Sequence, residues 1–392
     1  MEERRWLRRR ADSATVAGDQ LRLYRPTGEI ARIAVVVDQL DDAGLRTPLV
    51  EDVLAAFPYG ELHAATDRRA APGAVAHRTP VVWNPRARRC GLWRRRTAPA
   101  TPDLGDYDVV LRLGDRRARG FLAHPDALDL TFILGLDDGD DATREPTLGA
   151  ALRDRCAVQS ADRVWCATQR LVATLKRRWN VEAQLLYPPV ELAELGPSAR
   201  RGHLVLAAAD AITPSWNARL DALARWRVDL EIVKHGGPAV RRRRGGRSGP
   251  ASPARFAELL PHALAVVLPR GDGFEPRAVW AAAAGVPVIT PVNGAAAETV
   301  AGLTQRHPTG VLLDEPTDTA LADAIAFVER HAALFTPERL SAHAKRWSRP
   351  RFRQTLKRLV LEAWCEHVTA SADAEPATST PDAKAQAAAP AP

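Results

Sequence analysis

Short apolar runs alternate along the first half of the chain with segments whose apolar residues recur at helical spacing. Residues 33–37 (Ile-Ala-Val-Val-Val) contain no polar position, which is typical of a strand buried on both faces of a parallel sheet. A helix is predicted over residues 48–57, where Leu49, Val53, Leu54 and Phe57 share one face. Further strands are predicted at residues 61–65, 108–113, 130–134, 163–167 and 184–187.

The same alternation starts again after a segment rich in Gly, Pro and Arg at residues 196–202. Strands are predicted at 203–208, 230–233, 264–268 and 286–289, and helices at 215–226, 253–260, 278–284 and 318–330. Strands that alternate with helices form right-handed βαβ units. The predicted fold class is therefore α/β, with two Rossmann-like domains facing a cleft, and ligands of such folds bind at the carboxyl ends of the strands.

These patterns divide the chain into a leader at residues 1–29, an N-terminal domain at 30–195, a C-terminal domain at 203–350 and a C-terminal segment. The leader is basic and polar, so we expect it to be loosely attached. The last residues, 370–392, are mostly Ala, Pro, Asp, Thr and Ser without apolar periodicity. Such a segment cannot bury a core, and we expect a disordered tail.

Composition narrows the class of protein. Hydrophobic residues make up 46% of the 392 residues, and no apolar run approaches the roughly 18 residues that a membrane-spanning helix needs. The first ten residues have no apolar stretch behind their charges, which does not fit a secretory signal, so we expect a cytoplasmic protein. The four cysteines lack metal-ligand spacing, which predicts free thiols and no metal site.

The net charge of +8 favours anionic partners. Phosphorylated sugars fit this charge, and so does peripheral contact with an anionic membrane surface at the inner face of the membrane. We do not expect a nucleic-acid partner, because the basic residues are not interleaved with aromatic residues on one predicted face. The arginine run at 241–244 and the acidic run at 137–141 are interpreted as solvated loops, since the acidic run lacks EF-hand spacing.

The order of the motifs resembles that of the retaining glycosyltransferases of family 4, which have the GT-B architecture of two Rossmann-like domains. The matching segments of the second half are 231–238 (EIVKHGGP), 256–269 (FAELLPHALAVVLP), 272–274 (DGF), 281–289 (AAAAGVPVI) and 309–313 (TGVLL). In the first half, 160–168 (SADRVWCAT) and 187–190 (YPPV) resemble the family more loosely. The resemblance covers about residues 32–368.

The resemblance implies transfer of a sugar from a nucleotide-sugar substrate to a glycan or lipid-linked acceptor, without a metal or other cofactor. In cellular terms it implies a role in the synthesis of cell-surface polysaccharide. It also implies that residues 351–369 form a terminal helix that packs back on the N-terminal domain.

Several positions of the family's ligand residues are changed in this chain. The Gly-rich turn after the first strand is reduced to Leu-Asp-Asp-Ala-Gly at 40–44, and the family's histidine is absent from 134–141. The region of the Arg/Lys pair, residues 210–217, has no base before Arg219. Of two acids expected eight residues apart, the first is Asp272 and the second is Trp280, whose indole can only donate a hydrogen bond.

The candidates for donor binding are Asp272, Gly273, Phe274, Glu275, Arg270, Glu298 and His235. No residue is assigned as catalytic, and each candidate has a plainer structural alternative. Residues 272–274 contact the donor sugar or are a turn kept from an ancestor. Glu275 is a shifted acid or a helix N-terminal acid favoured by the helix dipole.

The other three candidates have similar alternatives. Glu298 contacts the ligand or caps a helix, Arg270 contacts phosphate or is solvated, and His235 lines the cleft or is a loop residue. Two functional hypotheses therefore stay open. The chain is an active glycosyltransferase, or it is a catalytically inactive homologue that acts as a binding or partner protein.

Overall fold

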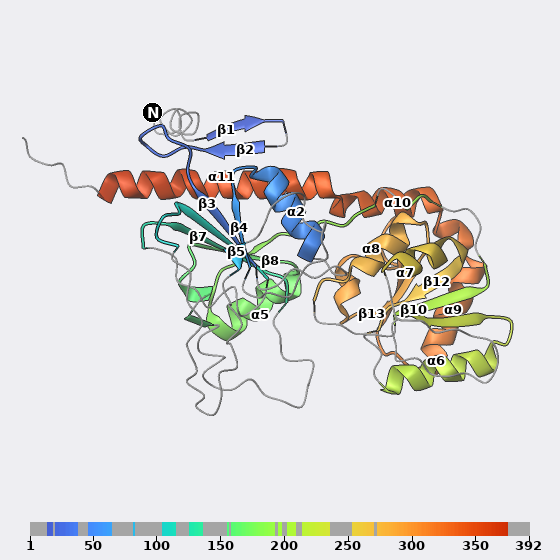
Figure 1. The fold of residues 1–392 in the computed structure, drawn as a ribbon. Coiled ribbons are helices and arrows are strands. Elements are labelled where there is room, and N and C mark those ends of the chain that lie inside the picture. Colours follow the sequence, from blue (N-terminus) through green and yellow to red (C-terminus); the bar gives the residue numbers. More distant parts are fainter. Residues whose placement is uncertain are drawn as a thin grey trace, which may run out of the picture.

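Two α/β domains lie next to each other and are joined by a long C-terminal helix (Figure 1). The computed structural model describes residues 14–18, 20–37, 46–64, 81–82, 104–114, 125–135, 155–156, 158–192, 195–197, 202–208, 214–235, 253–269 and 273–374. No helix in these ranges is both long enough and apolar enough to span a bilayer. Among the same residues, Cys156, Cys166 and Cys365 are not joined in a disulfide, and Cys90 lies outside them.

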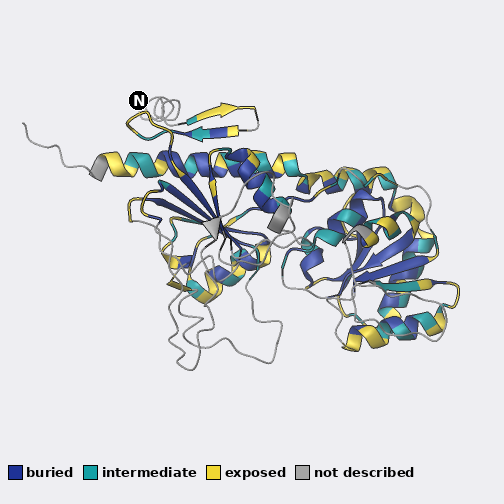
Figure 2. Ribbon diagram, in the orientation of Figure 1, coloured by how far each residue is buried: buried dark blue, intermediate teal, exposed yellow. Residues whose placement is uncertain are grey.

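The N-terminal domain is built on a seven-stranded parallel sheet in the order β5-β4-β3-β6-β7-β8-β9. The strands are β3 (Ile33–Val37), β4 (Glu61–Ala64), β5 (Val81–Val82), β6 (Val109–Leu113), β7 (Leu128–Ile133), β8 (Arg163–Cys166) and β9 (Gln184–Leu185). Helices α2 (Arg46–Ala56) and α5 (Gln169–Trp179) accompany them. The predicted strands are confirmed, and β3, β6 and β7 are buried along their whole length (Figure 2). The short edge strand β5 was not predicted.

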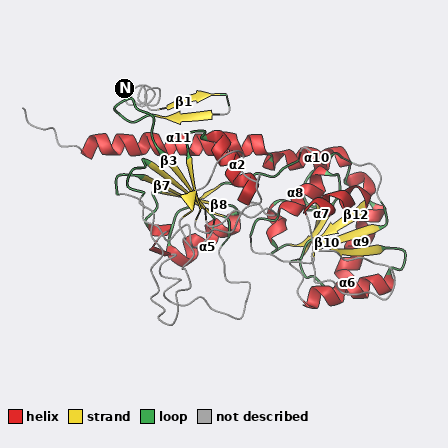
Figure 3. Ribbon diagram, viewed as in Figure 1, coloured by secondary structure: helices red, strands yellow, loops and turns green. Residues whose placement is uncertain are grey.

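The C-terminal domain contains a five-stranded parallel sheet in the order β11-β10-β12-β13-β14 (Figure 3). Its strands are β10 (Leu204–Ala208), β11 (Glu231–His235), β12 (Ala263–Val267), β13 (Val288–Pro291) and β14 (Gly310–Leu313). Its helices are α6 (Pro214–Trp226), α7 (Pro253–Leu259), α8 (Pro276–Ala283), α9 (Asp318–Arg330) and α10 (Pro337–Ala344). Short 3-10 turns lie at η2 (Leu260–His262), η3 (Ala295–Glu298), η4 (Ala332–Leu334) and η5 (Lys345–Trp347). Each sheet reverses its strand order once, at β3–β6 and at β10–β12, so both domains are doubly wound as predicted.

The segment AAAAGVPVI shows how sequence determines local structure. Helix α8 ends in a Schellman motif, in which Val286 N–H donates to the carbonyl of Ala281 and Gly285 has a φ of 80°. A Cβ on Gly285 would also lie 2.6 Å from Cβ of Pro337 in α10. Only glycine satisfies both constraints, and the strand predicted at 286–289 therefore begins at Val288.

The leader expected at residues 1–29 needs a correction. Strands β1 (Ala14–Ala17) and β2 (Gln20–Leu23) form an antiparallel hairpin. The sequence Gln-Leu-Arg-Leu alternates polar and apolar positions, and Leu21 and Leu23 are each only 1% exposed. This alternation anchors the hairpin to the N-terminal domain, so residues 14–23 are not loosely attached.

The terminal helix packs on the N-terminal domain as the resemblance implies. Helix α11 extends over Arg349–Ala374 and contacts α2, β2 and β7. Within this interface the rings of Phe352 and Phe132 lie 6.5 Å apart. The helix is longer than the predicted 351–369, and the prediction of disorder from residue 370 is wrong for 370–374. The rest of the predicted tail lies outside the described residues.

The chain crosses between the domains twice, and the two crossings lie against each other. Val190 N–H donates to the carbonyl of Trp347 at 2.9 Å. Next to this contact, the Arg349 guanidinium binds Asp52 at 2.9 Å, Glu191 at 2.9 Å and Glu51 at 3.1 Å. One arginine therefore ties α11 to α2 and to the segment that leaves the N-terminal domain.

We expect Arg349→Met to lower the free energy of unfolding by about 2 kcal/mol, because Asp52 is buried and, among the basic side chains that the structure describes, would keep only Arg353, at 3.2 Å. Urea unfolding measures the loss. Arg358→Met is the matched control on the same helix, where an exposed pair with Glu362 contributes about 0.5 kcal/mol. Equal losses in the two variants would contradict the role of Arg349.

One face of the N-terminal sheet carries a buried polar layer. Arg112 and His63 both flank Val36 in register, so the pleat directs them to the same face. Arg112 Nη2 donates to Asp129 Oδ2 at 2.8 Å, and both side chains are buried. Burial raises the pKa of Asp129 to about 7, although the Arg112 charge acts in the opposite direction.

Asp129 therefore makes stability depend on pH. Its folded pKa lies above its usual 3.8, so the folded state retains a proton that the unfolded state has released. The stability that this retained proton contributes is fully present below about pH 4 and is lost as the pH rises through about 7. Between about pH 5 and about pH 8, the unfolding free energy of the wild type should therefore fall relative to that of Asp129→Asn. A difference that stays constant would contradict this.

Candidate functional site

Loops that follow strands of the two sheets meet at the boundary between the domains. In the C-terminal domain, the loop between β12 and α8 contains Gly273. A Cβ on this glycine would lie 3.6 Å from the carbonyl oxygen of Leu134, which follows β7 of the N-terminal domain. Residues beyond the carboxyl ends of both sheets thus meet at the interdomain boundary, which is where ligands bind in doubly wound folds.

A carboxylate of the C-terminal domain caps a helix of the N-terminal domain. Glu298 accepts hydrogen bonds from the backbone N–H groups of Gln169 at 2.8 Å and Arg170 at 2.9 Å. Thr168 Oγ accepts from Leu171 N–H at 3.1 Å, so the first three N–H groups of α5 all have acceptors. A carboxylate is favoured at this end of the helix by the dipole as well. This interdomain cap uses both oxygens of Glu298.

A second contact follows the same interface. The Arg170 guanidinium donates to the carbonyl of Asn293 at 2.7 Å, in the loop between β13 and η3. Tyr187, in the segment between the domains, lies beside the cap. Burial, and then the neighbouring Glu298 carboxylate, raise the pKa of Tyr187.

Aromatic packing connects the cap to the crossing. The Tyr187 ring lies 6.1 Å from that of Phe274 and 5.9 Å from that of Trp347. A cavity of about 280 Å³ borders this group, with Glu298 and Arg351 among its lining residues. Phe274 is buried in this contact, which gives it a packing role at the domain boundary.

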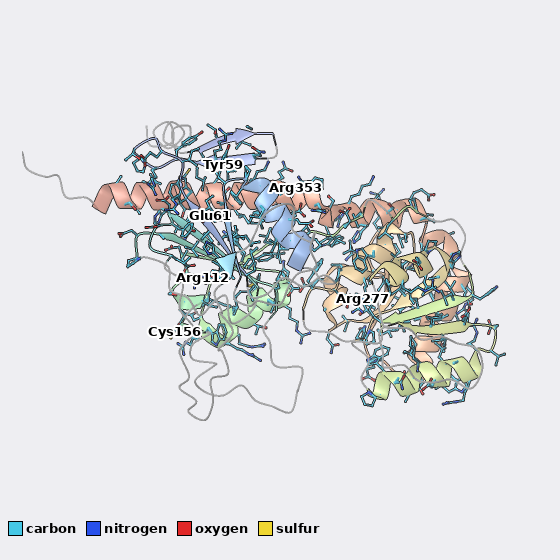
Figure 4. The ribbon with its side chains drawn as sticks, viewed as in Figure 1. Tyr59, Glu61, Arg112, Cys156, Arg277 and Arg353 are labelled. Carbon is cyan, nitrogen blue, oxygen red and sulfur yellow. The ribbon has the colours of Figure 1, made fainter. Side chains whose placement is uncertain are left out.

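Helix α8 begins with an ion pair. Glu275 is the N-cap residue and accepts from the backbone N–H of Arg277 at 3.1 Å. The same carboxylate binds the Arg277 guanidinium through Nε and Nη2, at 2.7 Å each. The side chains are only 14% and 15% exposed. Figure 4 shows Arg277 at the side of the C-terminal domain that faces the N-terminal domain.

The structure describes five of the seven predicted candidates, and for four of them it gives more than the backbone position. Gly273 and Phe274 lie at the domain boundary, Glu275 caps α8, and Glu298 caps α5 across the interface. The helix-terminal alternative for Glu275 and the capping alternative for Glu298 are thus borne out. Donor binding by these four residues stays a prediction.

For the remaining three candidates the structure gives a backbone position or nothing. His235 ends β11 and pairs in register with Ala208 at the end of β10, so its backbone lies at the carboxyl edge of the sheet. Arg270 and Asp272 lie outside the described residues, as do the altered glycine turn at 40–44, most of the segment at 134–141, and the arginine run at 241–244.

Trp280 is placed by packing within its own domain. Its ring centroid lies 6.3 Å from that of Phe256 in α7, and it contacts the apolar core of the C-terminal domain. The residue at the position where the resemblance implies a second acid therefore packs between helices α7 and α8. This packing accounts for an aromatic side chain at that position.

Sequence reasoning missed Arg170, Tyr187 and Arg277 as residues of this region. The segment Thr168-Gln169-Arg170 had an N-cap signal before an apolar periodic run, which locates a helix start but not its partner. No group of three His, Cys, Asp or Glu side chains among the described residues is arranged to hold a metal ion.

Comparisons with known proteins show which fold the chain has. No protein-family model matches the chain, and no curated protein sequence does. Among solved structures, the chain is similar to sucrose-phosphate synthase from Thermosynechococcus elongatus, with a TM-score of 0.56 and 15% identity over 86% of this chain and 100% of that one. It is also similar to Anabaena HepE in complex with UDP-glucose, with a TM-score of 0.64 and 13% identity over 85% of this chain and 100% of that one. The chain thus has the GT-B fold of these glycosyltransferases.

Glu298→Gln should loosen the contact between the domains, because a neutral amide has one acceptor oxygen for two N–H donors. We expect the amides of Gln169 and Arg170 to exchange hydrogen at least about tenfold faster, measured by NMR or mass spectrometry. Glu315→Gln, an exposed acid of the same domain, is the control. Unchanged exchange in Glu298→Gln would show that the cap does not hold the interface.

Proposed function

We propose that the protein transfers a sugar from a nucleotide-sugar to a glycan or lipid-linked acceptor, as a retaining glycosyltransferase of family 4. The observation that carries the proposal is the approach of Gly273, in the loop before α8, to the residue that follows β7 of the other domain. A donor seated at this boundary has one domain for its nucleotide and the other for its acceptor. The motif order over residues 32–368 supports the family assignment.

The chemistry places specific demands on this boundary. The bond between sugar C1 and the diphosphate oxygen breaks, and the nucleoside diphosphate leaves with the electron pair. A new bond joins C1 to an acceptor hydroxyl oxygen, whose proton passes to the leaving group or to solvent. The developing negative charge on the diphosphate is stabilised by N–H groups at a helix N-terminus and by cationic side chains. Helix α8 begins next to Gly273, and its N-terminus is already capped by the Glu275 carboxylate.

For the acceptor, the proposal rests on the charge of the protein and not on individual side chains. The net charge of +8 is consistent with peripheral attachment to an anionic membrane surface at the inner face, where a lipid-linked acceptor would be held. HepE was solved with UDP-glucose and with UDP, which motivates a uridine nucleotide as the first donor to test.

A catalytically inactive homologue that binds a partner is the second candidate. The packing of Trp280 against Phe256 favours it, because that position supplies no acceptor for ribose hydroxyls. An inactive homologue that binds the nucleotide differs from an active enzyme in turnover, and one that binds a partner protein differs already in donor binding.

We expect at least one of UDP-, GDP- and ADP-glucose to raise the melting temperature of the full chain, because a ligand of the native state stabilises it by RT ln(1 + [L]/Kd). A thermal-shift series up to about millimolar ligand gives the measurement. Absence of any shift would count against the enzyme and against a nucleotide-binding homologue.

Turnover separates the two candidates. Release of nucleoside diphosphate from the bound donor, with Asp272→Ala as the site variant, should be slower in the variant if the chain is an active transferase. Binding of a donor without any release by the wild type would favour the inactive homologue.

A further inference from the structure

We propose that the cavity at the turn from α10 into α11 is a binding site for a small phosphate monoester. The site is separate from the domain boundary at Gly273, and the inference goes beyond the proposed function without depending on it. The observation that carries it is a pair of arginines, Arg346 and Arg351, that line one cavity without acidic partners.

The cavity has a volume of about 280 Å³ and lies where the chain crosses between the domains (Figure 1). The lining residues that bear on binding are His343 of α10, Arg346 and Trp347 of η5, Arg351 of α11, Tyr187 and Glu298. They belong to the C-terminal domain and to the two crossing segments. No described residue of the loop before α8 lines this cavity, so a ligand here does not occupy the boundary at Gly273.

The two arginines differ from their neighbours on the same crossing. Arg349, Arg353 and Arg358 each bind a carboxylate. Among the residues that the structure describes, no ion pair and no side-chain hydrogen bond involves the guanidinium of Arg346 or of Arg351. A concave surface lined by one sign of charge concentrates the field and attracts ions of the opposite sign. The cavity therefore favours an anion.

His343 adds no positive charge of its own at neutral pH. Its Nε2 lies 2.9 Å from the carbonyl oxygen of Thr299, which can only accept, so this nitrogen carries the proton. Burial lowers the pKa of His343, and the nearby Arg346 charge acts in the same direction. The positive charge of the cavity thus comes from the two arginines.

Trp347 contributes a hydrogen-bond donor that lacks an acceptor. The side chain is 6% exposed, and its ring lies 5.1 Å from that of His343 and 5.9 Å from that of Tyr187. Nothing in the described part of the chain accepts from its indole N–H. Buried donors without a protein acceptor are rare, and water or a ligand then commonly supplies the oxygen. A phosphate ester brings several such oxygens to this wall.

Glu298 is the one acid among the described lining residues, and its charge is already engaged. Its two oxygens accept from the backbone N–H groups of Gln169 and Arg170 at the start of α5. The helix dipole also favours a negative charge at this place. Glu298 therefore leaves the charges of Arg346 and Arg351 available to a ligand.

Charge and size together indicate the class of ligand. A phosphate monoester carries a charge of about −1.5 to −2 at pH 7 and three strong acceptor oxygens, which suits two guanidinium groups better than a single carboxylate does. The volume of about 280 Å³ lies at the lower end of the roughly 300–1,000 Å³ found for ligand pockets. A phosphorylated sugar or polyol of one ring or less fits this space better than a nucleotide-sugar.

The test compares phosphate esters with their neutral counterparts. Glucose 6-phosphate and glycerol 3-phosphate, then glucose, glycerol, inorganic phosphate and UDP, are titrated by calorimetry into the full chain. The proteins are wild type, Arg346→Gln, Arg351→Gln and Arg339→Gln. Arg339 is an exposed arginine of α10 that does not line the cavity, so its variant is the matched control for the loss of one positive charge.

We expect at least one ester to bind the wild type more tightly than inorganic phosphate, and its neutral counterpart not to bind. Arg346→Gln and Arg351→Gln should each weaken binding of that ester at least about tenfold, and Arg339→Gln should not. Binding of UDP should be the same in all four proteins. Both arginines are exposed, so these variants keep the buried core, and Arg346→Lys and Arg351→Lys should give smaller losses because they retain the charge.

Several results would overturn the inference. They are absence of ester binding up to about millimolar concentration, equal affinity of wild type and both glutamine variants, and an equal loss in Arg339→Gln. Inorganic phosphate that binds as tightly as the esters would show an adventitious ion only. A parallel loss of UDP binding in Arg346→Gln would assign the arginines to the donor instead. Ester binding by a wild type that binds no nucleotide would overturn the proposed function and leave this inference intact.

Discussion

The arrangement of the two domains depends on the Arg349 guanidinium, which binds three acids at the place where the chain crosses between them. A buried carboxylate without its cation is costly, so Asp52 and Arg349 hold each other in place. This fixes the start of α11, and the rest of the helix then covers α2, β2 and β7. The second crossing, at Val190, follows the same path through its hydrogen bond to Trp347.

The cap that Glu298 forms on α5 is a second contact between the domains, separate from the ion pairs of Arg349. Its carboxylate satisfies two N–H groups that would otherwise need water or a ligand, and Tyr187 links it by packing to Trp347 at the crossing. A movement of one domain that separates Glu298 from α5 would expose the helix terminus. The contact therefore couples domain position to the state of an anion-binding end of a helix.

The candidate site has the backbone arrangement of a doubly wound fold, but its charged residues differ from those that the resemblance implies. Trp280 packs on Phe256 at a position where the resemblance to family 4 implies an acid, and the segment after β10 has no base. The ion pair of Glu275 and Arg277 lies instead at the N-terminus of α8, beside the loop that meets the other domain.

The sequence by itself determined the two doubly wound sheets, because β-branched runs such as 33–37, in alternation with helical segments, are typical of strands buried on both faces. It also determined the end of α8, where Gly285 supplies the positive φ that closes the helix. The hairpin at 14–23 was missed because its two buried leucines form too short a pattern to outweigh the polar residues around them. Partners more than a hundred residues apart were decided by tertiary structure alone: Glu298 with α5, and Arg349 with Asp52. Local periodicity reports which face of an element is buried, but not which distant charge will lie against it.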